Sequence, residues 1–139
     1  GRTSKKDGAG FYDYPTGGKK KLWKGLKDMF NSRVEALDEE TIAKRIMHRQ
    51  ALESYRCLEE GVLRSTTDGD LGSVLGWGFP IYTGGSLSYI DFVGIQQFVA
   101  DCDDFRNRFG GDRWAVPDSL RNLAEGGKSV HERNKEVRA

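Results

Sequence analysis

The strongest constraint on the fold is the spacing of apolar residues in the segment 95–109. They recur at steps of three and four residues, which places them on one face of a helix, and they are Ile95, Phe98, Val99, Cys102, Phe105 and Phe109. The opposite face carries amide and charged side chains. Burying each phenylalanine is worth about 1.5–3 kcal/mol, so we expect this face to pack against a core. Gly110 and Gly111 are expected to end the helix.

A second, longer helix is expected to begin at Asp38. Asp38 is a suitable N-cap, and Glu39 and Glu40 place carboxylates in the first turn, where they suit the helix dipole. The pattern continues to about residue 63, and its expected stripe is Ile42, Ile46, Arg49, Glu53, Tyr55, Leu58 and Val62. The two polar members weaken the stripe, which is typical of a helix partly exposed to a partner.

Two shorter helices are expected on either side of the segment 95–109. Asp68 is expected to cap a short helix that includes Val74 and Leu75. A last helix is expected to start with Pro117 at its first position and to run through Leu120, Leu123 and Ala124. No stretch shows convincing period-two alternation, so the predicted fold class is all-α, a multi-helix domain.

Length and overall charge narrow the class of protein. A chain of 139 residues is about one domain and can bury roughly two-thirds of the surface that its unfolded form exposes. A net charge of +1 gives no strong attraction to nucleic acid or to an anionic membrane. No apolar run approaches the ~18 residues of a membrane span, so we expect a soluble protein. Two cysteines without CxxC spacing predict neither a disulfide network nor a metal site.

The uneven distribution of charge divides the chain into three parts. Residues 1–30 hold eight Lys or Arg against three Asp. We therefore expect an irregular basic leader over residues 1–37, a helical domain over residues 38–130 and a polar, frayed tail over residues 131–139. The leader is interpreted as a solvated, mobile segment. Alternatively, Trp23 among Lys19–Lys24 makes a basic contact for a CoA or lipid phosphate.

The residues alone assemble neither a nucleotide loop nor an active site. The stretches "DGAGFYDY" and "NLAEGGKS" each lack a glycine that a nucleotide loop requires, and no buried strand precedes them. His48 has Lys44 rather than a carboxylate one turn back, so it is expected at the surface or at an interface. His131 falls in the tail. No spacing of metal ligands is present in the sequence.

Several motifs in register resemble one family. They are "GFYDY" (10–14), "RCLEEGV" (56–62), "DLGSVLGWGFPIYTGGSLSYIDFVG" (70–94), "FGGDRW" (109–114) and "LRNLAEGGKS" (120–129). Their order resembles that of the C-terminal helical domain of 3-hydroxyacyl-CoA dehydrogenases. The chain looks most like the last, second-copy domain of the multifunctional fatty-acid β-oxidation enzymes, which join an enoyl-CoA hydratase to that dehydrogenase. The resemblance covers about residues 8–130.

The resemblance implies a fold of the 6-phosphogluconate dehydrogenase C-terminal-like type and a place in a larger parent. Such enzymes transfer hydride between NAD and the 3-hydroxy carbon of an acyl-CoA, with a Rossmann domain and a His–Glu pair that this chain lacks. They carry two copies of the helical domain. By the resemblance, Gly10–Tyr14 mark the junction and the rest is the second copy. The implied partners are the preceding helical and NAD-binding domains.

Two groups of residues take expected roles from the resemblance. In the first copy an Asn-Arg pair helps to position substrate. Here the pair is Lys44-Arg45. We interpret this as a degenerate position, because a lysine side chain has no hydrogen-bond acceptor to replace the amide oxygen of asparagine. The glycine-rich loop of the family is a structural reversal between helices, and its residues here are Gly76, Gly78, Phe79, Pro80, Gly84 and Gly85. Trp77 and Phe79 are expected to plug the packing beneath it.

These implications predict a non-catalytic scaffold within an NAD-dependent parent enzyme. The chain itself is expected to hold no catalytic, cofactor-binding or metal-binding residue, and to be inactive alone. It is expected to pack against the catalytic copy and to self-associate as a dimer when that partner is missing, while NAD and acyl-CoA bind elsewhere in the parent. The alternative is an independent helical module that binds acyl-CoA or protein. The expected compartment is cytoplasmic in a bacterium, and mitochondrial or peroxisomal in a eukaryote.

Overall fold

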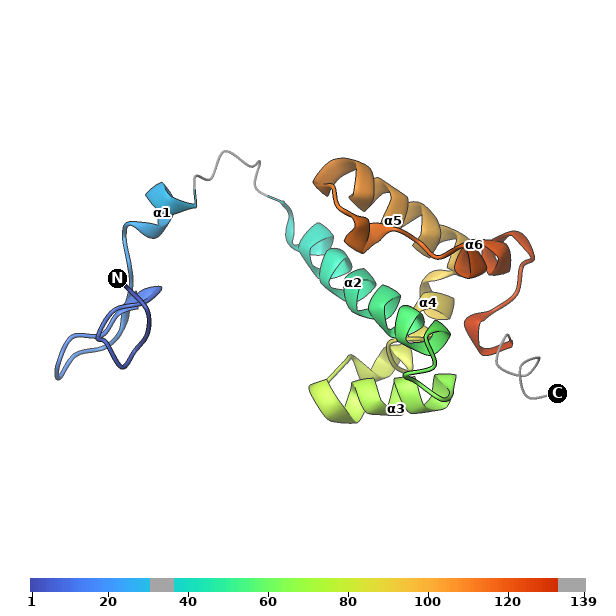
Figure 1. Cartoon of the computed structure of the whole chain (residues 1–139), viewed down its shortest axis with the longest axis horizontal. Coiled ribbons are helices and arrows are strands. Elements are labelled where there is room, and N and C mark those ends of the chain that lie inside the picture. Colours follow the sequence, from blue (N-terminus) through green and yellow to red (C-terminus); the bar gives the residue numbers. More distant parts are fainter. Residues whose placement is uncertain (31–36, 133–139) are drawn as a thin grey trace. The chain divides into compact units, whose positions relative to one another are not determined.

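Helices dominate the structure, and the all-α class predicted from the sequence is confirmed. The computed structural model describes residues 1–30 and 37–132 and divides the chain into two compact units, residues 1–37 and 38–139 (Figure 1). The more specific 6-phosphogluconate dehydrogenase C-terminal-like fold stays a prediction. Among the described residues, no helix is both long enough and apolar enough to cross a lipid bilayer.

The first unit is a small hairpin followed by one turn of helix. β1 (Tyr12–Asp13) pairs antiparallel with β2 (Lys21–Leu22), and α1 spans Leu26–Met29. Arg2 donates to the Gly10 carbonyl at 3.0 Å and to the Asp13 carboxylate, and its guanidinium lies 4.4 Å from the ring centre of Trp23. None of the side chains of residues 1–30 is buried, so polar and cation–π contacts hold this unit rather than an apolar core.

The long helix α2 (Glu39–Glu59) begins where the sequence predicts. The Asp38 carboxylate accepts a hydrogen bond from the Thr41 N–H at 2.7 Å, which satisfies one of the free amides at the helix start. The predicted apolar stripe is wrong in the first half of the helix, because Ile42 and Ile46 are exposed. The face that packs into the core is instead formed by His48, Ala51, Leu52, Ser54 and Tyr55.

The next segment folds back on α2 through three elements. α3 spans Thr66–Trp77, a 3-10 turn η1 spans Ile81–Thr83, and α4 spans Ser88–Val93. The prediction that Asp68 caps α3 is wrong, because Ser65 is the N-cap and its hydroxyl accepts from the Asp68 N–H at 3.1 Å. The cap therefore lies three residues earlier, and α3 is longer than expected.

α5 (Ile95–Phe109) confirms the helix that most constrains the fold. Its predicted apolar face is the one that packs inward, with Phe98 fully buried and Phe105 nearly so. A 3-10 turn η2 (Asp112–Trp114) and α6 (Asp118–Glu125) follow, with Pro117 as the N-cap of α6 rather than its first residue. α5 contacts α6, α4, η2 and α2, and Figure 1 shows α2 between α3 on one side and α5 on the other.

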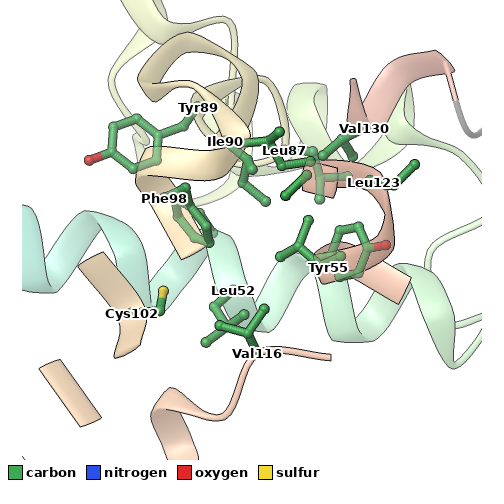
Figure 2. Packing of buried hydrophobic residues seen from close by; sticks show 14 of the residues in the cluster. Leu52, Tyr55, Leu87, Tyr89, Ile90, Phe98, Cys102, Val116, Leu123 and Val130 are labelled. Carbon is green, nitrogen blue, oxygen red and sulfur yellow. The ribbon is translucent and has the colours of Figure 1, made fainter. Parts of the chain in front are cut away.

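The core is one cluster of buried apolar side chains drawn from α2, α4, α5, α6 and the segments between them (Figure 2). Its largest fully buried apolar members are Tyr55, Phe98, Leu52, Leu87, Ile90, Leu120, Val130 and Cys102. Val130 comes after α6, so the chain returns to the core beyond its last long element. The tail is therefore anchored at its start.

Gly85 lies where the glycine-rich loop passes closest to α3. Its φ of +128° is one that side-chain-bearing residues rarely adopt, and a Cβ atom there would lie 2.5 Å from Asp70 Cα. Gly76 is different, because it belongs to α3 and a Cβ atom there would meet no other atom within 4 Å. Of these two glycines, only Gly85 has a backbone conformation and a close contact that require glycine.

We expect alanine to have opposite effects at these two glycines. Gly85→Ala should lower the free energy of unfolding by about 2 kcal/mol or more, because the Cβ atom meets backbone and the φ is strained. Gly76→Ala should raise it by about 0.4–1 kcal/mol, because alanine favours the helix and restricts the unfolded chain. Urea unfolding of both variants measures the difference. Equal destabilisation by the two substitutions would contradict this assignment.

Candidate functional site

The glycine-rich loop is held by a carboxylate that projects from α3. One oxygen of Asp70 accepts from the N–H groups of Leu87 and Ser88 at 2.8 and 2.9 Å, and the other accepts from the Ser88 hydroxyl at 2.6 Å. Next to it, the Ser73 hydroxyl donates to the Asp70 carbonyl and accepts from the Ser86 N–H. These bonds satisfy the start of α4 from inside the protein, so the polar groups of the loop are used in the fold.

The aromatic residues of the loop take different positions. Phe79 is buried, as expected, and the preceding Gly78 ends α3 in the left-handed conformation with φ +75°. The expectation that Trp77 plugs the packing is wrong, because 57% of its surface is exposed and its indole donates to Gln50 at 2.9 Å. Pro80 precedes η1 as its N-cap.

His131 lies between two carboxylates and ties the tail to the loop. Its Nε2 is 3.0 Å from an oxygen of Asp70, and its Nδ1 is 3.0 Å from an oxygen of Asp91. Asp91 also accepts from the Val130 N–H at 2.8 Å. The expectation of a frayed tail is therefore wrong at its first residue. Both ring nitrogens are engaged by carboxylates of the fold, so His131 serves to hold the tail against the loop.

His48 forms a second histidine–aspartate pair, inside the core. Its Nε2 lies 3.2 Å from an oxygen of Asp101 on α5, and its Nδ1 lies 2.9 Å from the Lys44 carbonyl and 3.0 Å from the Tyr89 hydroxyl. Its ring stacks on Phe98 at 4.6 Å. The expected surface or interface position is wrong, because the His48 side chain is completely buried.

The electrostatics of this pair keep the histidine neutral and the aspartate charged. Burial lowers the pKa of His48 below its usual value, against the opposing charge of Asp101. Burial also disfavours the ionised form of Asp101, but hydrogen bonds from Lys44 and Gln97 outweigh it, and the pKa of Asp101 is lowered. Burial raises the pKa of Tyr89 to about 12, so its hydroxyl stays protonated.

A histidine with a carboxylate partner is the pattern of a general base, but this one has no access to a substrate. No surface of His48 is exposed, so a reacting atom meets its ring only if α2 and α5 separate. The pair therefore serves the packing of the two helices. Sequence reasoning missed it because Asp101 is 53 residues away and lies on another helix.

The residues of the predicted degenerate pair point to different neighbours. The Lys44 ammonium lies 2.7 Å from the Asp101 carboxylate, so it bridges α2 and α5. The Arg45 guanidinium lies 3.8 Å from the ring centre of Phe109. Neither contact involves a substrate. The expectation that this pair no longer positions substrate therefore stays a prediction.

The other reactive side chains form no assembled centre. Burial raises the pKa of Cys102 to about 12, which keeps its thiol protonated and unreactive. Cys57 and Cys102 are both free thiols. Across residues 1–30 and 37–132, no group of three or more His, Cys, Asp or Glu side chains could hold a metal ion.

Large apolar side chains gather instead on the outside of the helical unit. The exposed apolar set, as we call it, comprises Leu71, Leu75 and Trp77 on α3, Ile81 and Tyr82 on η1, and Phe92 on α4. Leu75 is 81% exposed and Ile81 is 78% exposed, and the rings of Tyr82 and Phe92 lie 6.1 Å apart. Contiguous exposed apolar groups mark contact sites for proteins, membranes or ligands. The structure therefore defines an all-α domain with large exposed apolar side chains on α3, η1 and α4.

Comparison with known proteins finds relatives of one kind. The chain is 36% identical over 133 residues to fatty acid oxidation complex subunit alpha of Vibrio campbellii. The aligned region is 95% of this chain and 19% of that subunit. The same subunit of Shewanella loihica is 37% identical over 133 residues, covering 94% of this chain and 19% of the relative. That of Shewanella frigidimarina is 36% identical over 138 residues. No protein-family model matches the chain.

These relatives confirm the resemblance to the multifunctional enzymes of fatty-acid oxidation. The chain is homologous to a domain-sized segment of the fatty acid oxidation complex alpha subunit. It spans about a fifth of the length of the relatives it matches, 19% in each of the three named here.

We expect the imidazole of His48 to titrate below the ordinary histidine value of about 6.5. Because the folded pKa is lowered, the unfolded chain binds the proton first, so His48 contributes stability above about pH 6.5 that is lost as the pH falls, by at most about 1.4 kcal/mol per pH unit. NMR titration of the ring protons measures the midpoint, and His131→Gln assigns the two histidines. The His48→Gln variant should lose less stability than the parent chain between about pH 7.5 and 5.5. A midpoint at or above 6.5 would contradict the buried neutral assignment.

Proposed function

We propose that the chain is a non-catalytic packing domain of a multifunctional fatty-acid β-oxidation enzyme. In this proposal the parent oxidises 3-hydroxyacyl-CoA to 3-ketoacyl-CoA with NAD and is fused to an enoyl-CoA hydratase. The preceding helical domain and the NAD-binding domain are its partners, and NAD and acyl-CoA bind to them rather than to this chain. The named relatives are bacterial proteins, and the compartment that goes with the proposal is the cytoplasm.

The observation that carries the proposal is the exposed apolar set. Six large apolar side chains between 56% and 81% exposed lie on α3, η1 and α4. Contacts between domains of one chain bury about 600–1,500 Å², and apolar side chains in such a contact each contribute when they leave water. The catalytic copy of the helical domain is the partner that we assign to this set.

Two further features support a role without chemistry. The His48–Asp101 pair has the composition of a catalytic dyad, but its imidazole is completely buried. Lys44, at the position where the family's catalytic copy carries asparagine, is paired with Asp101 at 2.7 Å. A lysine engaged in this way is a cross-link between helices, and freeing it would break a charge-assisted hydrogen bond.

The basic leader gives less support to the alternative of an independent CoA-binding module. The Trp23 ring is already covered by the Arg2 guanidinium, and the Lys20 ammonium lies 4.7 Å from the ring centre of Tyr12. These contacts occupy one face of Trp23 and one face of Tyr12, whereas Phe11 and Phe30 are exposed. The alternative therefore depends on Lys19 and Lys21 meeting a phosphate without the face of Trp23 that Arg2 covers.

We expect the isolated chain to self-associate through the exposed apolar set, because its partner domain is missing. The double variant Leu75→Ser/Ile81→Ser should shift the chain toward the monomer in sedimentation velocity. Each substitution should change the free energy of unfolding by only about 0.5 kcal/mol, because both side chains are largely exposed. Ile46→Ser is the matched control, an exposed isoleucine on α2 outside the set. A chain that stays monomeric at high concentration would count against this use of the set.

We also expect the isolated chain to be inactive as a dehydrogenase. The rate of NADH consumption should not exceed the blank when acetoacetyl-CoA is added, because the chain brings no cofactor domain and the ring of His48 is buried. Turnover above the blank would overturn the packing-domain proposal. Calorimetry with CoA tests the alternative, and binding that is lost in Lys19→Ala/Lys20→Ala/Lys21→Ala would favour it.

A further inference from the structure

The first unit carries positive charge that its own carboxylates do not neutralise. Residues 1–30 hold eight Lys or Arg against three Asp, a formal charge of +5, whereas the whole chain carries +1. Arg2 is paired with Asp13, but no ion pair between described residues includes a lysine of this unit. Those seven lysines are all exposed, and they are Lys5, Lys6, Lys19, Lys20, Lys21, Lys24 and Lys27.

Large apolar side chains of the same unit are exposed as well. Phe11, Leu22, Met29 and Phe30 are each between 61% and 64% exposed, and the rings of Phe11 and Phe30 lie 6.1 Å apart. Since no side chain of residues 1–30 is buried, these four have no core of their own to enter. Apolar surface in water favours transfer to an apolar environment. The unit therefore combines unpaired cations with apolar surface that it cannot bury itself.

The kinds of side chain in this unit favour a lipid bilayer over the other anionic surfaces. Interfaces between proteins are depleted in lysine, whereas seven of the eight cations here are lysine. A single-stranded nucleic acid needs aromatic faces for its bases, but the Phe11 and Phe30 rings are close and inclined at 45° to each other. Leu22 and Met29 offer no stacking surface, and the acyl boundary of a bilayer accepts both.

We propose that the first unit is a peripheral membrane contact that binds anionic phospholipid. Its lysine ammonium groups meet the headgroup phosphates, and Phe11, Leu22, Met29 and Phe30 enter the boundary between headgroups and acyl chains. The two kinds of contact act together, because the attraction of lysines to anionic lipid adds to the burial of apolar surface. The proposal is independent of the packing role of the exposed apolar set, which lies on the helical unit.

Flotation of the full chain with lipid vesicles tests the contact. Vesicles of equal parts phosphatidylglycerol and phosphatidylcholine should bind the chain at least about tenfold more tightly than vesicles of phosphatidylcholine alone. Binding should weaken as NaCl is added, because salt screens exposed charges. Equal binding to both kinds of vesicle would overturn the proposal. Tighter binding to single-stranded polyuridine than to the anionic vesicles would overturn it in favour of a nucleic-acid contact.

Charge variants place the contact on the first unit. Lys19→Ala/Lys21→Ala should weaken binding to the anionic vesicles by about tenfold or more, and Lys19→Arg/Lys21→Arg should keep it. Arg64→Ala/Arg113→Ala is the matched control, because it removes the same charge from two exposed positions of the helical unit. It should bind as the parent chain does. An equal loss in the two alanine variants would contradict the assignment to this unit.

Apolar variants separate this contact from the packing role. Leu22→Ser/Met29→Ser should weaken binding to the anionic vesicles, whereas Leu75→Ser/Ile81→Ser, from the exposed apolar set, should leave it unchanged. The amide NMR spectrum checks that the hairpin stays folded in each variant. Loss of vesicle binding only in Leu75→Ser/Ile81→Ser, or full affinity in folded Leu22→Ser/Met29→Ser, would overturn the proposal. Neither result depends on whether the chain self-associates.

Discussion

The packing of α5 against α2 is the contact on which the helical unit depends. Phe98 of α5 stacks on His48 of α2, and Asp101 meets both His48 and Lys44 across the same contact. An apolar face that repeats over fifteen residues has no alternative to burial, since each exposed phenylalanine would lose about 1.5–3 kcal/mol. α4, η2 and α6 all pack on α5, so their positions follow from this one pairing.

The polar contact within that packing fixes the pair of helices in one register. A wholly apolar interface tolerates sliding, whereas a buried neutral imidazole that donates to Asp101 and accepts from the Tyr89 hydroxyl is satisfied in one arrangement only. Asp70 does the same for the second half of the unit. It holds the start of α4 through Leu87 and receives His131 from the far end of the chain, so the glycine-rich loop and the tail close together.

The sequence predicts best those features that depend on residues close together in the chain. The face of α5, the Asp38 cap and the all-α class depend on residues within a turn or two, and all three are confirmed. The first half of α2 was misassigned because Ile42 and Ile46 have helical spacing, and spacing does not say whether an apolar face meets the core or stays exposed. The partners of His131 are 40 and 61 residues away, so neither carboxylate could be assigned from the tail sequence.

Buried polar groups and exposed apolar groups occupy different parts of this unit. The His48 ring is enclosed between α2 and α5, where it is closed to substrate, whereas large exposed apolar side chains lie on α3, η1 and α4. Figure 1 shows α3 and α5 on opposite sides of α2. The exposed apolar side chains of α3 therefore lie away from the contact between α2 and α5 that buries His48. A contact with another domain through α3 can form without opening that packing.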